Sequence, residues 1–214
     1  MNEELRIKLE ESDAIDNYHK FSERGDEYFY KEEYDSAIKN MERALDALEI
    51  YIPANIKLIL VNLSHRLLFL GLRNELLLQL GISYRKMGYY YKAKEIFEEI
   101  IHFTKEFGID NFLGFNEMIL GYYPIPRDEL LRKAWSEIGL IYKDLKLYNS
   151  ALNAYYKSLY SVSIIPSFSS HNPWLEIAYL HEQLGDFSAA KSAKKKFKKT
   201  EKLIIKADRK RCQW

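Results

Sequence analysis

The chain has almost no cysteine, the residue whose disulfides stabilise small secreted proteins. Among its 214 residues there is one cysteine, Cys212, alongside five prolines and nine glycines. A single cysteine excludes an internal disulfide and fits a reducing compartment. We therefore expect a cytoplasmic protein.

Long hydrophobic runs are also missing. The most apolar part of the chain, residues 56–63 and 67–70, is interrupted by Lys57, His65 and Arg66. It falls short of the roughly 20 apolar residues that a membrane-spanning helix needs. The first 13 residues are acidic and contain no apolar segment of the kind found in secretory signals. The sequence thus predicts neither a membrane span nor a signal peptide.

Motifs that would indicate a reaction are absent as well. Lys86 precedes Gly88 instead of following a glycine, so the order of a phosphate-binding loop fails. His181 and Glu182 begin like a zinc-protease motif, but Gly185 stands where the second histidine belongs. The five histidines show no paired ligand spacing. We expect a protein that is not an enzyme and that has no metal site and no cofactor.

The chain does contain a helical-hairpin pattern. Apolar and small residues recur at steps of three and four on either side of Gly88, which predicts two helical faces separated by a break. The positions are Leu77, Leu80, Gly81 and Tyr84 before the break, and Tyr90, Ala93, Phe97 and Ile100 after it. The small residues lie where two helix axes approach, and the aromatic residues fill the space around them.

These residues resemble the tetratricopeptide repeat, a helical hairpin of about 34 residues. A second good copy consists of Trp135, Ile138, Gly139, Tyr142, Tyr148, Ala151 and Tyr155. A degraded copy near the start consists of Phe21, Gly25, Tyr28, Tyr34, Ala37, Met41 and Ala44. The last copy consists of Trp174, Ile177, Ala178, Gly185, Phe187, Ala190 and Phe197, with His181 and Lys194 at two aromatic positions.

The resemblance implies an all-α fold, an α-solenoid of antiparallel helix pairs with about nine to eleven helices. We expect one domain over residues 1–214, with repeats near 18–50, 74–107, 132–165 and 171–200. Gly25, Gly81, Gly139 and Ala178 are 56, 58 and 39 residues apart, which indicates insertions at 51–73 and 108–127. The first insertion is either an extra buried helix or an early start of the next helix. The second either covers the groove as a lid or packs on the edge of the repeats.

In the family that this chain resembles, the first helix of each repeat lines a concave surface that holds a partner. The resemblance places nine candidate partner-binding residues there: Tyr30, Leu78, Ile82, Arg85, Lys86, Lys133, Leu140, Lys143 and Tyr179. Such a surface suits a peptide or helical segment with acidic and apolar residues. The other interpretation is that these are ordinary exposed helix positions. The Lys and Asn set with which some family members clamp acidic chaperone tails is not reproduced.

The net charge of +1 hides a strong polarity. Residues 1–50 hold 15 acidic and 7 basic side chains, whereas residues 191–211 hold 11 basic and 2 acidic ones. Both ends could be solvated caps of a solenoid, or they could attract each other between molecules and give a homo-oligomer. The basic segment 191–214 could instead bind nucleic acid or an anionic surface. Its candidate residues are Lys194, Lys195, Lys196, Lys198, Lys199, Lys202, Lys206, Arg209, Lys210 and Arg211.

We therefore expect a protein-binding adaptor or scaffold as the first function. Nucleic-acid or anionic-surface binding is the alternative, and self-assembly through the charged ends is a third.

Overall fold

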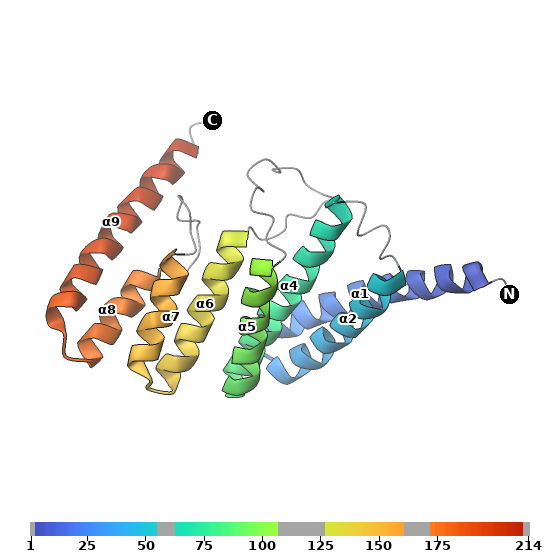
Figure 1. The fold of residues 1–214 in the computed structure, drawn as a ribbon, viewed down its shortest axis with the longest axis horizontal. Coiled ribbons are helices and arrows are strands. Elements are labelled where there is room, and N and C mark those ends of the chain that lie inside the picture. Colours follow the sequence, from blue (N-terminus) through green and yellow to red (C-terminus); the bar gives the residue numbers. More distant parts are fainter. Residues whose placement is uncertain (1–2, 55–62, 107–126, 161–171, 212–214) are drawn as a thin grey trace. The chain divides into compact units, whose positions relative to one another are not determined.

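The structure, a computed structural model, describes residues 3–54, 63–106, 127–160 and 172–211. These residues form eight α-helices and no strand, which confirms the predicted all-α class (Figure 1). The helices are α1 (Glu3–Tyr30), α2 (Tyr34–Ala54), α4 (Leu63–Lys86), α5 (Tyr90–Glu106), α6 (Arg127–Asp144), α7 (Tyr148–Tyr160), α8 (Pro173–Gln183) and α9 (Phe187–Arg211).

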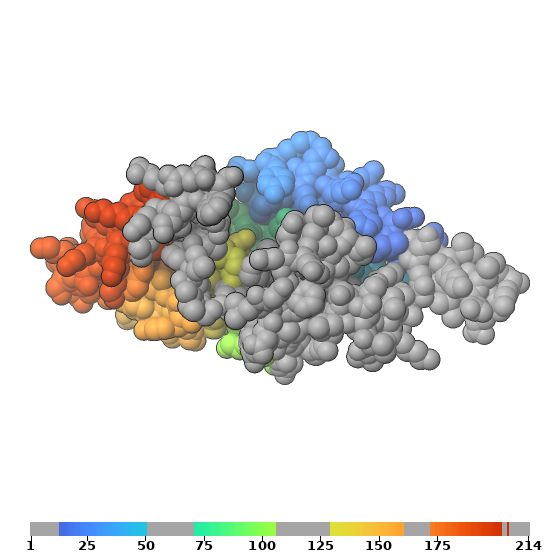
Figure 2. Space-filling view, turned by 90° about the horizontal axis from the view of Figure 1, so that it is seen from above, coloured from blue at the N-terminus to red at the C-terminus, as the bar shows by residue number. Residues whose placement is uncertain are grey.

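The chain divides into two compact units, Met1–Pro126 and Arg127–Trp214, and each contains two of the four predicted repeats. In unit 1, α2 packs against α1 and α4, and α4 packs against α5. In unit 2, α6 packs against α7, α7 against α8 and α8 against α9 (Figure 1), and Figure 2 shows the surface of this unit coloured from yellow to red. The predicted antiparallel helix pairs are confirmed within each unit. A single domain over 1–214 stays a prediction.

The first predicted insertion contains the start of a helix. Helix α4 begins at Leu63, well before the repeat pattern that starts near residue 74. Two interpretations of residues 51–73 were possible, an extra helix or an early start of the next helix. For residues 63–73 the second is correct. Residues 55–62, and residues 108–126 of the second insertion, lie outside the described residues.

The same helix-ending turn occurs four times, at residues 31–33, 87–89, 145–147 and 184–186. In each turn one residue has positive φ: Glu32 (60°), Gly88 (82°), Lys146 (58°) and Gly185 (79°). The amide of the following residue donates to a carbonyl five positions back, over 2.8–2.9 Å: Glu33 to Tyr28, Tyr89 to Tyr84, Leu147 to Tyr142 and Asp186 to His181. This is the Schellman cap, which closes a helix and reverses the chain. Four such caps show four hairpins, including the two whose sequence pattern is degraded.

Three of the four hairpins have a glycine at the contact between their two helices. A Cβ added to Gly81 would lie 2.7 Å from the Phe97 ring, and one added to Gly139 would lie 2.9 Å from the Tyr155 ring. Both rings are fully buried, so they cannot move aside. Gly25 has the same relationship with Met41, at 2.9 Å. The glycines therefore let a large side chain from the second helix pack directly on the first helix.

The last hairpin achieves its packing differently. Ala178 occupies the small position and is fully buried, while Lys194 stands sixteen residues later in place of an aromatic ring. Lys194 is exposed and donates to the Glu182 carboxylate. Without a ring to accommodate, the first helix tolerates a methyl group at residue 178. The alanine at position 178 is therefore compatible with the repeat because position 194 carries no ring.

Candidate functional site

The first helices of the two repeats in unit 2, α6 and α8, are joined by one lysine. The Lys143 ammonium group on α6 lies 2.8 Å from the Glu176 carboxylate on α8 and 5.8 Å from the centre of the Tyr179 ring. These contacts show that α6 and α8 present neighbouring side chains on one surface. Two of the predicted partner-binding residues, Lys143 and Tyr179, are therefore brought together.

Apolar side chains accompany this charge. Tyr179 and Leu175 on α8 are 43% and 51% exposed. Leu140 on α6 is half-buried and packs against the core of the unit, and Lys133 is also half-buried. We define the α6/α8 surface as Lys133, Leu140, Lys143, Leu175, Glu176 and Tyr179. It combines two exposed apolar groups with a charged pair.

The charge of Lys143 is already compensated in the free protein. Its side chain is 25% exposed and that of Glu176 is 19% exposed, so both are partly withdrawn from water. An acidic partner would have to compete with Glu176 for the ammonium group. The aliphatic stem and the neighbouring tyrosine ring remain available whether or not this exchange occurs.

The candidates in unit 1 are more scattered. Tyr30 is 78% exposed and stacks edge-on against Phe29, with ring centres 5.9 Å apart. Lys86 is exposed, while Ile82 and Arg85 are half-buried. The prediction of Leu78 as a surface residue is wrong: it is only 5% exposed and belongs to the core of unit 1.

A polar cluster between α1 and α4 was not among the predicted site residues. Burial raises the pKa of Tyr18 to about 12, while Ser22 stabilises its ionised form by a hydrogen bond and the Glu75 and Asp26 charges raise the pKa further. Burial also raises the pKa of Asp26, and the nearby Glu75 and Glu23 carboxylates act in the same direction against a hydrogen bond from Gln79. In unit 1, two carboxylates, those of Asp26 and Glu75, therefore lie near a buried tyrosine.

A weak sequence signal for this cluster exists. Asp26 and Glu75 lie on the first helices of adjacent repeats, which pack in order along a repeat protein. Two acidic residues on adjacent first helices can therefore approach each other. The pattern does not reveal that Tyr18 is buried beside them.

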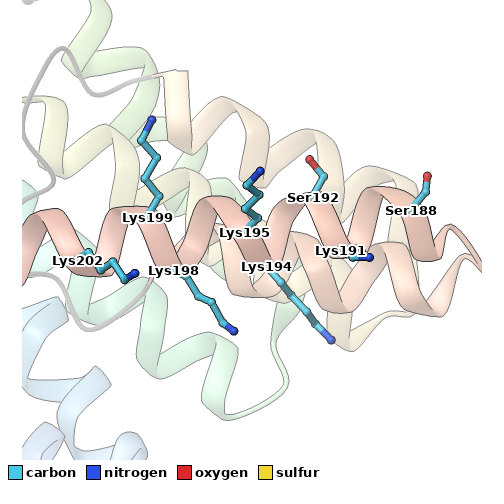
Figure 3. A pocket seen from close by; sticks show the side chains of 8 residues that line it. All are labelled: Ser188, Lys191, Ser192, Lys194, Lys195, Lys198, Lys199 and Lys202. Atoms are coloured by element: carbon cyan, nitrogen blue, oxygen red, sulfur yellow. The ribbon is translucent and has the colours of Figure 1, made fainter.

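Helix α9 carries the predicted basic residues. Lys194 pairs with Glu182, and Lys196 lies 4.3 Å from the centre of the Trp174 ring. An open hollow of about 940 Å³ runs along the helix, lined by Ser188, Lys191, Ser192, Lys194, Lys195, Lys198, Lys199 and Lys202 (Figure 3). The predicted residues Lys206, Arg209, Lys210 and Arg211 belong to α9, but their side chains lie outside the described residues.

The described residues contain neither a candidate metal site nor a candidate membrane span. Among the side chains that the structure describes, no group of three or more His, Cys, Asp and Glu residues is placed to hold a metal ion. None of the helices in the described ranges is both long enough and apolar enough to cross a membrane.

Comparison with known proteins agrees with the geometry. A family model described as tetratricopeptide repeat matches residues 75–102 and 133–161, which contain the α4–α5 and α6–α7 turns. The solved structure of the apo form of RapI is 16% identical, with a TM-score of 0.61 over 91% of this chain and 44% of the RapI chain. This chain therefore spans less than half the length of RapI, and at such low identity the likeness shows the fold alone.

Two solved structures of MamA are also similar. One is 16% identical, with a TM-score of 0.45 over 89% of this chain and 94% of the MamA chain. The other, MamA from Desulfovibrio magneticus RS-1, is 15% identical, with a TM-score of 0.31 over 87% of this chain and 96% of that one. No curated protein matches this sequence. The four capped hairpins make the chain a helical-repeat protein, and two of its segments, residues 75–102 and 133–161, match the tetratricopeptide repeat.

Proposed function

We propose that the chain is a non-enzymatic scaffold that binds a segment of a partner protein on the α6/α8 surface of unit 2. The observation that carries this proposal is the contact of Lys143 with both Glu176 and Tyr179. It fixes an ammonium group, a carboxylate and an aromatic ring from two successive first helices beside each other. Stacked repeats make such surfaces because each first helix exposes the same face.

The partner segment fits a defined chemistry. Leu175 and Tyr179 are exposed apolar groups that can bury side chains of a partner, and buried aromatic anchors provide much of the binding energy in protein interfaces. A carboxylate on the partner replaces Glu176 at Lys143, which sets orientation more than affinity. We therefore propose an extended or helical segment that carries at least one apolar and one acidic side chain.

Unit 1 supplies a second, independent surface in this proposal. Its exposed Tyr30 and Lys86 and its half-buried Ile82 and Arg85 are the remaining candidates. Cytoplasmic localisation and self-association through the oppositely charged ends stay predictions.

A photo-crosslinking amino acid at two tyrosine positions tests the proposal. Tyr179 and Tyr160 are both exposed and both belong to unit 2, but Tyr160 ends a second helix and is not part of the α6/α8 surface. In cells of the native host, the probe at position 179 should capture a defined protein through a short segment, and the probe at position 160 should not. Equal capture at both positions, or none at position 179, would overturn the proposal.

A further inference from the structure

A row of lysines follows the outer face of α9. We define the lysine row as Lys191, Lys195, Lys198, Lys199 and Lys202, which are all exposed. Lys191, Lys195, Lys198 and Lys202 recur at steps of four, three and four, so they share one side of the helix, and Lys199, next to Lys198, borders that side. Ala190 and Ala193, which are buried at 1% and 3% exposure, face the other side and pack into unit 2. Figure 3 shows the lysine side chains extending from α9 along its length.

The five lysines of the row differ from the other lysines of α9 in the partners that surround them. Lys194 is paired with Glu182 and Lys196 covers the Trp174 ring, so these two are used inside the unit. No acidic side chain within the described residues lies at ion-pair distance from the five lysines of the row. Unit 2 as a whole has 17 Lys and Arg against 9 Asp and Glu, a net charge of +8. The row is therefore a concentrated line of positive charge.

We propose that the lysine row binds the phosphate backbone of double-stranded nucleic acid. Lys191 and Lys202 are eleven positions apart, and at about 1.5 Å per residue the row extends over about 16 Å. One strand of B-DNA carries a phosphate about every 3.4 Å of helix axis, so about five phosphates occupy the same length. Ser192, which lines the same hollow, adds a hydroxyl that can donate to a phosphate oxygen.

The composition of the row disfavours a protein as its occupant. Protein interfaces are depleted in lysine, and their affinity comes mainly from aromatic and apolar anchors. The row contains neither. A polyphosphate chain needs no such anchor, because the release of its condensed counterions drives binding. Contacts to phosphates carry no sequence information, so we expect the row to bind duplexes of any sequence.

The geometry of the row disfavours a membrane. Helices that lie on membranes insert an apolar face opposite their basic face. In α9 the face opposite the lysines is occupied by the packing of Ala190 and Ala193 inside unit 2. The positive charge also forms a line one helix wide and not a broad patch, which matches a strand of phosphates better than a lipid surface.

Binding by the lysine row is independent of the proposed scaffold function. The lysine row and the α6/α8 surface share no residue, so a variant of one leaves the side chains of the other in place. Loss of nucleic-acid binding and loss of partner binding can therefore be told apart.

The test is the salt dependence of binding to a fluorescent DNA duplex of about 20 base pairs and arbitrary sequence, followed by anisotropy. With about five phosphates neutralised, the logarithm of the association constant should fall against the logarithm of salt concentration with a slope of about −4.5. The variant Lys191→Gln/Lys195→Gln/Lys198→Gln/Lys202→Gln should reduce this slope to about −1 and weaken binding more than tenfold at low salt. The matched control changes four exposed lysines of unit 1, Lys20, Lys31, Lys39 and Lys105, to glutamine and should keep the slope.

Three results would overturn the inference. The first is a row variant that binds the duplex as the unchanged protein does. The second is a deletion of residues 203–214 that abolishes duplex binding, because the row remains in that chain. The third is that the wild-type protein binds vesicles containing phosphatidylserine and does not bind the duplex.

Discussion

Gly81 and Phe97 face each other across the α4–α5 hairpin so closely that a Cβ on Gly81 would lie 2.7 Å from the ring. The corresponding distance between Gly139 and the Tyr155 ring is 2.9 Å in the α6–α7 hairpin. In both hairpins the two residues are sixteen positions apart, and both rings are fully buried. The spacing of the repeat pattern is therefore a direct record of one side-chain contact.

The change Gly139→Ala should destabilise unit 2. The added methyl group clashes with Tyr155, and overpacking of a core costs about 1–3 kcal/mol, against which the better helix propensity of alanine returns about 1 kcal/mol. We expect a net loss of about 1 kcal/mol, measured by urea unfolding followed by circular dichroism. In a Tyr155→Leu background the same change should cost less, because the smaller side chain relieves the clash. A gain of about 1 kcal/mol in the single variant would mean that propensity alone decides and that the contact is absent.

Asp26→Asn should stabilise unit 1 at neutral pH. The pKa of Asp26 is raised, so the folded state favours the protonated carboxyl and the ionised form weakens folding at neutral pH. Asparagine removes that charge and can still accept the hydrogen bond from Gln79. We expect a higher melting temperature at about pH 7 in thermal unfolding.

The pH dependence supplies the control for Asp26→Asn. As pH falls through the raised folded-state pKa towards the ordinary value of 3.8, Asp26 gains its proton and the unchanged protein recovers the lost stability. The advantage of Asp26→Asn should therefore shrink in acid. An advantage that is equal at neutral pH and below about pH 4 would contradict the proposed burial of the charge.

Tyr18 should make unit 1 sensitive to alkali. Its folded-state pKa of about 12 exceeds the ordinary value of 10.0, so the folded state holds its proton more tightly than the unfolded state does. This contribution is fully present below about pH 10 and is lost as pH rises to about 12. In denaturant titrations, Tyr18→Phe should lose less stability than the unchanged protein over that interval. Parallel losses in the two proteins would show that Tyr18 does not contribute.

The N-terminal cap of α8 supports the position of the α6/α8 surface. The Asn172 side chain accepts a hydrogen bond from the Trp174 amide over 3.1 Å. Asn172→Ala should cost about 1 kcal/mol, as losses of such caps usually do, whereas Asn172→Asp should keep the cap. Thermal unfolding of the three proteins checks this order. Equal stability of Asn172→Ala and the unchanged protein would count against the cap.

Much of the fold is predictable because hairpin packing leaves a spaced pattern in the sequence. Gly88 and Gly185 can be recognised as breaks, since glycine readily adopts positive φ. The equivalent residues Glu32 and Lys146 cannot, because their side chains disfavour that conformation and only the surrounding hairpin imposes it.

The candidate site is less predictable. Residues at equivalent positions of successive repeats lie on the same face. This rule predicts Lys143 and Tyr179 on one face, where the structure has them in contact. Equivalent positions do not give the depth of a side chain, so the pattern predicts Leu78 on the surface although it is buried. The ion pair with Glu176 is not predicted either, because residue 176 is not among the places at which family members meet their partners.

The most direct measurement of partner binding is the affinity of the purified partner segment, identified by crosslinking at position 179, for variants of unit 2. Tyr179→Ala should weaken binding about tenfold or more, as loss of an aromatic anchor does, and Lys143→Ala should weaken it less, because its charge sets orientation more than affinity. Tyr160→Ala, which removes an exposed ring outside the α6/α8 surface, should leave the affinity unchanged. Unchanged affinity in both α6/α8 variants, or an equal loss in Tyr160→Ala, would contradict the proposal that this surface holds the partner.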